Sequence, residues 1–311
     1  MMIYDVESIP KKHNTKVIIL IILIAVTAIA LSVFAAMKLA NHLHTSIVKE
    51  NENTQNQIEE QTEGTTRNTE NQTIQEEQNT KGGGEESTQN QAPFTETQLE
   101  AINNIYSSKG EKRAFLTFDD GPSTTVTPKI LAILKQQNIK ATFFVLGTMV
   151  KSNPNILKQE YEQGHYIANH SYSHVYKTVY ANNNSAFEEY QKTESLIQNA
   201  LGNSNYHSNV FRFPGGSIGG YYNSIKVEAK KIFKEKGVAY LDWNALTNDA
   251  DGARTKEDIM KNLKSTTKGK NSIVVLMHDA PNKSLTAETL PDVISYLREQ
   301  GYTFKNLYDI I

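Results

Sequence analysis

The sequence predicts an α/β fold for residues 109–311, a parallel sheet with helices outside whose roughly seven strand–helix units could close into a barrel. Two observations predict it. Short apolar runs alternate with longer segments of helical periodicity, which is the pattern of a parallel sheet covered by helices. Polar residues able to do chemistry stand directly after several of these runs, and parallel barrels place their reactive groups at such strand ends.

The expected elements follow one another in a simple order. We expect strands at 114–118, 142–146, 165–168, 210–213, 238–243, 272–277 and 303–305. We expect helices at 127–137, 154–163, 185–201, 224–236, 256–265 and 287–300. Pro128 supports the start of the first helix, because proline is well tolerated in a first turn. The run Ile273–Leu276 is β-branched and aliphatic, which favours a buried strand.

The N-terminal part of the chain predicts a membrane anchor. Residues 1–16 form a short polar tail on the cytoplasmic side, and the apolar run after it predicts a transmembrane helix at 17–38. At about 1.5 Å per residue, that helix spans the roughly 30 Å of a bilayer's hydrocarbon core. The alternative is a cleaved signal peptide ending near Ala35-Ala36, although the run is longer than a usual signal core. The N-terminus is expected inside because of the preceding Lys11, Lys12 and Lys16.

Residues 39–108 predict a disordered, low-complexity linker. They are dominated by Asn, Gln, Thr and Glu, with Gly82-Gly83-Gly84 in the middle. Such a segment cannot bury enough apolar surface to offset the entropy lost on ordering it. We therefore expect a tether between the membrane and the domain at 109–311.

The composition excludes several classes of site. The chain has no cysteine, so disulfides and thiolate metal sites are impossible. Its formal net charge of −2 gives no basic surface, and we expect no nucleic-acid partner. His165 and His207 are expected to be structural or solvated histidines without a role.

The segment from Asn169 to His174 and the pair Asp119-Asp120 predict a metal site. His170 and His174 are four residues apart and can face one metal ion. Paired aspartates before Gly-Pro are ordinary turn residues when taken alone. One carboxylate with two imidazoles, however, makes a facial triad that leaves coordination positions open, as in catalytic sites. The second carboxylate is then free to act as a base.

Further matching segments appear downstream, at Arg212–Gly216 and at Leu276–His278. Together with Thr117–Pro122 and His170–His174 they resemble the polysaccharide deacetylase family, carbohydrate esterase family 4, which carries the NodB homology domain. The resemblance extends from near Gly110 to the C-terminus. It implies the NodB-like fold, a distorted (β/α) barrel, and a hydrolase that removes acetyl groups from a polysaccharide.

The resemblance also implies a role for each matching residue. One divalent metal ion, zinc by preference and otherwise cobalt, nickel or manganese, would be held by Asp120, His170 and His174. Asp119 would be the general base and His278 the general acid, and Arg212 would orient Asp119 or Asp249. The substrate-binding residues would be Pro214, Gly215, Trp243, Leu276 and Tyr172.

Two departures from the family pattern affect these roles. The residue after Pro214 is usually aromatic in the family and here is Gly215, whose N–H remains as an oxyanion donor. The fourth motif of the family is unclear, because Asp242-Trp243 and Asp249-Ala250-Asp251 both lie in the right interval. We assign Asp249 as the carboxylate that keeps His278 protonated and Trp243 as an aromatic wall.

The expected substrate follows from the expected location. A single-pass protein of the cell membrane, with its catalytic domain outside, would face peptidoglycan, so N-acetylglucosamine of that polymer is the expected target. Other glycans remain open, namely xylan, chitin oligomers, N-acetylmuramic acid and O-acetyl esters. A catalytically weak, membrane-tethered wall-binding protein is the alternative from another class.

Overall fold

The computed structural model describes residues 93–108 and 110–311, which belong to one compact unit, Glu85–Ile311. The predicted tail at 1–16, the transmembrane helix at 17–38 and the linker up to residue 92 lie outside the described residues. Within the part of the chain that is described, no helix is both long and apolar enough to cross a membrane.

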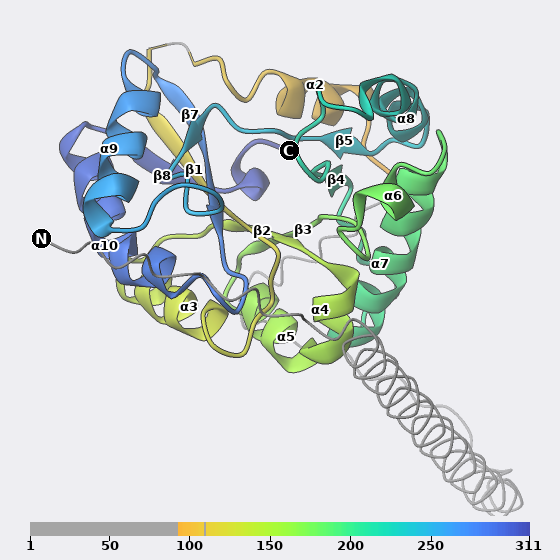
Figure 1. Ribbon diagram of the computed structural model, residues 1–311, viewed down its shortest axis with the longest axis horizontal. Helices are drawn as coiled ribbons and strands as arrows, with labels where there is room; N and C mark the ends of the chain where they lie inside the picture. Colours follow the sequence, from red (N-terminus) through yellow and green to blue (C-terminus); the bar gives the residue numbers. More distant parts are fainter. Residues whose placement is uncertain (1–92, 109) are drawn as a thin grey trace, which may run out of the picture. The chain divides into compact units, whose positions relative to one another are not determined.

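The centre of the domain is a curved sheet of eight strands (Figure 1). Every strand pairing in it is parallel. The order is β5-β4-β3-β2-β1-β7-β6, and β8 pairs with the first half of β1. The strands are β1 (Arg113–Asp119), β2 (Thr142–Val145), β3 (Tyr166–Asn169), β4 (Val210–Phe211), β5 (Ala239–Tyr240), β6 (Ala245–Leu246), β7 (Ser272–His278) and β8 (Thr303–Lys305). The predicted parallel α/β architecture is confirmed.

Helices cover the outside of this sheet, and α9, α10, α3, α5 and α7 lie next to one another along it (Figure 1). The helices are α2 (Glu96–Asn103), α3 (Thr127–Gln136), α4 (Gly147–Ser152), α5 (Pro154–Glu162), α6 (Tyr176–Val179), α7 (Ser185–Leu201), α8 (Asn223–Glu235), α9 (Lys256–Thr267) and α10 (Ser284–Glu299), with a 3-10 turn at Leu307–Asp309. The short helices α4 and α6 were not predicted, because each spans one or two turns.

The two faces of the sheet have separate apolar cores. On the helix side, Leu116, Phe118 and Val275 pack in the larger cluster. On the inner side, Phe115 and Val274 pack in a second cluster. Successive side chains of a strand point to opposite faces. Asp119 and His278 are an even number of residues from Phe115 and Val274 on the same strands. Both strand ends therefore face the interior.

The described sheet is not closed into a barrel by hydrogen bonds, so the expected distorted (β/α) barrel is an open one. Strands β5 and β6 are the two ends of the described sheet and do not pair with each other. The sequence predicted a single strand over 238–243, but the chain leaves β5 after Tyr240 and re-enters the sheet at Ala245. We call the unpaired gap between β5 and β6 the seam. There the buried Arg212 side chain donates from Nε to the Leu241 carbonyl at 2.9 Å.

Helix α2 corrects the predicted linker boundary. Residues 96–103 were expected to be disordered, yet they form a helix whose Leu99 and Ile102 are buried in the inner cluster. Thr95 caps it, accepting from the Gln98 N–H while the Gln98 side chain accepts from the Thr95 N–H. The Phe94 N–H also donates to the Gly237 carbonyl at 2.9 Å. The folded domain therefore includes residues 94–108. The sequence prediction missed them because they follow a low-complexity stretch.

Candidate active site

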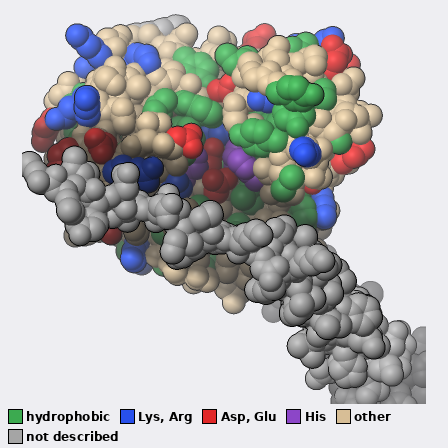
Figure 2. Space-filling view, in the orientation of Figure 1, with side chains coloured by type: hydrophobic (Ala, Val, Ile, Leu, Met, Phe, Trp, Pro, Cys, Tyr) green, Lys and Arg blue, Asp and Glu red, His purple; other side chains and the backbone are tan. Residues whose placement is uncertain are grey.

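The strand ends bring distant parts of the sequence to one edge of the sheet. Asp119 ends β1 and His278 ends β7, and the two are paired in register. His170 follows β3, and Arg212 follows β4. The prediction that these residues stand at the carboxyl ends of parallel strands is confirmed. Figure 2 shows histidine and acidic side chains together in the hollow of this face.

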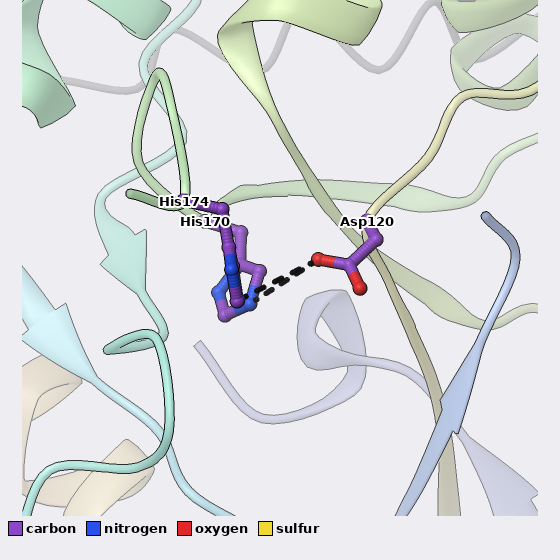
Figure 3. A group of neighbouring side chains, drawn as sticks. All are labelled: Asp120, His170 and His174. Atoms are coloured by element: carbon purple, nitrogen blue, oxygen red, sulfur yellow. Dashed lines mark ion pairs between the residues drawn. The ribbon is translucent and has the colours of Figure 1, made fainter. Parts of the chain in front are cut away.

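Asp120, His170 and His174 form a group whose ligand atoms all lie within 4.8 Å of one another. The Nε2 atoms of His170 and His174 are 3.7 Å and 3.8 Å from Asp120 Oδ1. Both imidazole rings point at that one oxygen (Figure 3). Two ligand atoms of a tetrahedral ion, each about 2.0–2.1 Å from it, lie about 3.3 Å apart. Each of the two histidine nitrogens therefore needs to move only a few tenths of an ångström toward Asp120 Oδ1 to share a metal ion with it.

Two further observations fit a metal ligand set. Asp120 Oδ1 is buried, yet it accepts no hydrogen bond from any described residue, and a buried carboxylate oxygen without a donor is costly unless a cation sits there. The backbone is also strained, because Asp120 has φ 74° and His174 has φ 56°. Non-glycine residues rarely adopt this left-handed conformation, and such strain persists where function requires it.

Surrounding hydrogen bonds hold the two histidines in place. The Nδ1 atom of His170 is 2.8 Å from the Arg212 carbonyl, which requires Nδ1 to carry the proton and leaves the Nε2 lone pair facing Asp120. Burial lowers the pKa of His170 to about 3, so the ring is neutral and available as a ligand. The loop between the histidines is fixed by Glu189 Oε2, which accepts from the N–H of Tyr172 at 3.1 Å and from that of Ser173 at 2.7 Å.

Asp119 lies beside the metal group and is held by Arg212. Arg212 Nη1 donates to Asp119 Oδ1 at 2.6 Å, and the other oxygen, Oδ2, is 3.7 Å from His170 Nε2. Burial raises the pKa of Asp119, and the Arg212 charge opposes that rise. Arg212 is fully buried and its guanidinium lies 3.8 Å from the Phe144 ring centroid. Of the two partners proposed for Arg212, the structure selects Asp119.

His278 lies next to Asp249, as the assignment of the fourth motif requires. Its Nδ1 is 2.9 Å from Asp249 Oδ1, and its backbone N–H donates to Oδ2 at 2.8 Å. Thr286 Oγ1 also donates to Oδ2, at 2.7 Å. Burial lowers the pKa of His278, but the hydrogen bond and charge of Asp249 outweigh it and raise that pKa to about 9. His278 is therefore a protonated donor at neutral pH.

The remaining predicted substrate residues form the surroundings of this group. Gly215 is exposed, and its N–H has no acceptor among the described residues, which leaves it available to an oxyanion. Pro214 is buried, and its carbonyl accepts from the Tyr180 hydroxyl at 2.7 Å. Trp243 is half-buried beside the inner cluster, with Gly216 against its ring. Leu276 faces the interior two residues before His278 and is also half-buried.

The two tyrosines that flank His174 lie on different sides of the loop. The Tyr172 ring packs against Gly147 and under Lys192, whose Nζ is 3.4 Å from the ring centroid. Tyr172 therefore packs on α4 and α7. Tyr176 instead lies beside the site, with its ring centroid 5.7 Å from that of His174.

Sequence reasoning missed Glu189, Glu194 and Tyr176. Glu194 accepts from Asn169 Nδ2 at 3.0 Å and from the Ser208 N–H at 2.9 Å, which fixes the end of β3 just before His170. Both glutamates lie on α7, where a helical glutamate usually faces solvent, so the sequence carries no signal for them. His165 is buried beneath the sheet and His207 lies 4.0 Å from Glu194, both outside the metal group.

Comparison with known proteins identifies the family of this fold and site. The family model described as polysaccharide deacetylase matches residues 106–240. A peptidoglycan-N-acetylglucosamine deacetylase of Bacillus cereus is 34% identical over 66% of this chain and 72% of its own length. The enzyme of the same name from Listeria monocytogenes is 34% identical over 65% of this chain. This chain spans only 40% of the length of that Listeria relative.

A solved structure agrees with these matches. The carbohydrate esterase family 4 esterase of Streptococcus mutans superposes with a TM-score of 0.61 at 33% identity, covering 67% of this chain and 90% of that one. The fold and the site thus define the parallel α/β fold and the strand-end residue group of the polysaccharide deacetylase class. The chain belongs to the polysaccharide deacetylase family, and the resemblance seen in its motifs is confirmed.

Proposed function

We propose that this chain is a metal-dependent deacetylase that removes N-acetyl groups from N-acetylglucosamine in peptidoglycan. The observation that carries the proposal is the arrangement of two proton-transfer groups around one ligand set. Asp119 is held by Arg212 and His278 by Asp249, and the ligands Asp120, His170 and His174 are all present. A protein that had lost catalysis would have no need to keep both pairs.

The proposed reaction uses these residues in turn. A divalent metal on Asp120, His170 and His174 would polarise the acetyl carbonyl and lower the pKa of water. Asp119 accepts the proton of the attacking water as the new C–O bond forms, and the Gly215 N–H stabilises the negative charge on the carbonyl oxygen. His278 then gives its Nε2 proton to the sugar nitrogen as the C–N bond breaks. The products are acetate and a free amine.

The substrate is supported by two independent observations. The relatives from Bacillus cereus and Listeria monocytogenes are both named for N-acetylglucosamine of peptidoglycan. The sequence at 17–38 favours a membrane anchor with the domain outside, and the wall glycan is the acetylated polymer nearest to such an anchor. Protease added to wall-stripped cells should then release the domain by cutting within residues 51–92.

The competing substrates differ in the bond that is cleaved. Acetylated xylan and O-acetyl sugars are esters, whereas chitin oligomers and peptidoglycan carry amides. An amide leaving group must be protonated before it departs, and His278 is a strong candidate for that donor because its pKa is raised to about 9. This favours an amide substrate over an ester.

The test is acetate release by the full-length chain from four substrates at equal acetyl concentration. These are N-acetylglucosamine oligomers, purified peptidoglycan, peptidoglycan already stripped of N-acetylglucosamine acetyl groups, and acetylated xylan. The proposal expects the first two to react fastest. Faster release from xylan would defeat the amide assignment, and faster release from the stripped peptidoglycan would point to N-acetylmuramic acid. Inactivity on all four would favour the wall-binding alternative.

A further inference from the structure

Two adjacent glycines separate two aromatic side chains in the site. Gly215 and Gly216 have φ 73° and 83°, a conformation that side-chain-bearing residues rarely adopt. A Cβ atom on Gly215 would lie 2.5 Å from the Tyr176 hydroxyl oxygen and 3.1 Å from its Cζ. A Cβ atom on Gly216 would lie 3.5 Å from Cη2 of Trp243. Tyr176 therefore occupies the space that a side chain at position 215 would fill.

Neighbouring aromatic rings hold Tyr176 in this place. Its ring centroid is 5.9 Å from that of Tyr180 and 6.5 Å from that of Tyr222, both in edge-to-face geometry. Tyr180 in turn donates its hydroxyl to the Pro214 carbonyl, which ties α6 to the segment that carries Gly215. The position of Tyr176 relative to Gly215 is thus built into the fold.

Tyr176 nevertheless presents an open surface next to a predicted metal ligand. The residue is 43% exposed, and its hydroxyl has no hydrogen-bond partner among the described residues. Val175, which precedes it in the chain, and Ile218, which follows the glycine pair, are also exposed large apolar side chains. Figure 2 shows hydrophobic side chains gathered over this region of α6 and α8, beside the hollow with the histidines.

Such a surface suits a sugar ring. A pyranose has C–H groups on its faces, which pack on an aromatic ring, and hydroxyl and amide groups on its edges, which need hydrogen-bond partners. A tyrosine supplies both, and a fixed ring loses little conformational freedom when ligand binds. Trp243, on the other side of the glycine pair, offers a second aromatic surface.

We propose that Tyr176 is a substrate-contacting, specificity-determining residue, whose ring forms the wall of the site on the Gly215 side and whose hydroxyl binds a polar group of the acetylated sugar. This inference rests on the proposed function, because it concerns the surface that binds the same glycan. Since the Tyr176 ring stands where a residue 215 side chain would stand, only one of the two can form this wall.

The only tryptophan of the chain gives a direct readout of binding, because Trp243 lies at the same glycine pair. Tryptophan fluorescence of the full-length, zinc-loaded chain is titrated with an N-acetylglucosamine tetramer, in an Asp119→Asn background that slows turnover. We expect Tyr176→Ala to weaken binding about tenfold, the loss of roughly 1.4 kcal/mol of aromatic contact. Tyr176→Phe should weaken it about threefold, through loss of one hydrogen bond.

The matched control is Tyr221→Ala. Tyr221 is 93% exposed and its ring contacts that of Tyr222, not Tyr176 or His174. This variant should bind within about twofold of the parent, and all variants should retain their zinc. Unchanged binding by Tyr176→Ala, an equal loss in Tyr221→Ala, or no binding by the parent would each overturn the inference.

Acetate release separates this inference from the proposed function. Binding that depends on Tyr176 in a chain that releases no acetate would defeat the proposed function and leave the inference standing. Acetate release by the parent chain, together with an unchanged KM in Tyr176→Ala, would support the proposed function and contradict the inference. The spatial exclusion has its own test in Gly215→Asn, since asparagine tolerates the left-handed backbone. Gly215→Asn should lower the thermal stability of the chain less when Tyr176 is already Ala than when Tyr176 is present. Equal losses in the two backgrounds would contradict the exclusion.

Discussion

Asp249 accepts two hydrogen bonds from His278, one from the ring Nδ1 at 2.9 Å and one from the backbone N–H at 2.8 Å. The carboxylate therefore fixes both the orientation of the ring and its proton. Because Nδ1 carries one proton to Asp249, the Nε2 proton of the charged ring is the one that can leave. This pairing fits the proton-donor role that we propose for His278, whose ring is not part of the group formed by Asp120, His170 and His174.

Asp249→Asn should move the alkaline limit of activity to lower pH. A general acid works only while protonated, so turnover falls as pH rises through the pKa of His278, which Asp249 raises to about 9. A bound dication lowers this pKa in parent and variant alike, so the comparison between them is the informative quantity. The measurement is kcat between about pH 6 and 10. The exposed Asp251→Asn is the control, and superimposable profiles for Asp249→Asn and the parent would contradict the role.

His174→Ala should lose the metal while the domain stays folded. Its Nε2 is one of the three candidate ligand atoms and lies 3.8 Å from Asp120 Oδ1, and the ring is only half-buried, so truncation removes little packing. Elemental analysis of the purified chain measures the effect directly. His207→Ala changes a histidine outside the group and should keep its metal. Full metal content in His174→Ala would refute the ligand assignment.

Asp119→Asn should keep the metal and lose turnover by about 10²–10⁴-fold, the usual contribution of a general base. The amide occupies the same volume beside Arg212 but cannot take a proton from water. Asp120→Asn is the matched comparison, because it should lose metal as well as turnover. Near-normal turnover in a metal-loaded Asp119→Asn chain would require another base.

Arg212→Met should destabilise the fold by about 3–5 kcal/mol, because it leaves the buried Asp119 carboxylate without its charged partner. It also removes the hydrogen bonds to the Leu241 and Asp242 carbonyls at the seam between β5 and β6. Chemical denaturation measures the change in the free energy of unfolding. Arg298→Met, on an exposed helix surface, should change it by less than about 1 kcal/mol. Equal effects of the two changes would show that Arg212 has no special structural role.

Local sequence was enough to predict the parts of the site that stand at strand ends. Asp119, His170 and His278 follow or end apolar strands, and parallel pairing brings such ends together whatever the rest of the chain does. The sequence offered two acidic segments as the partner of His278, and Asp249 was the one predicted. The structure places Asp249 beside the His278 ring.

Contacts between distant segments could not be predicted in this way. The seam between β5 and β6 depends on Arg212 reaching carbonyls on another strand connection. Tyr176 fills the space above Gly215, although 38 residues separate them. Helix α2 was missed because its amphipathic turns are short and follow a polar low-complexity stretch, and only the tertiary burial of Leu99 and Ile102 reveals it.

Metal-dependent release of acetate is the most direct measurement of the proposed chemistry. The full-length chain is incubated with an N-acetylglucosamine oligomer before chelation, after chelation, and after zinc is returned, with Asp119→Asn in parallel. We expect acetate and free amine in equal amounts from the parent chain, loss of both on chelation, recovery with zinc, and little product from Asp119→Asn under any condition. Acetate release that survives complete removal of metal, or none from a fully zinc-loaded parent chain, would contradict a metal-dependent deacetylase.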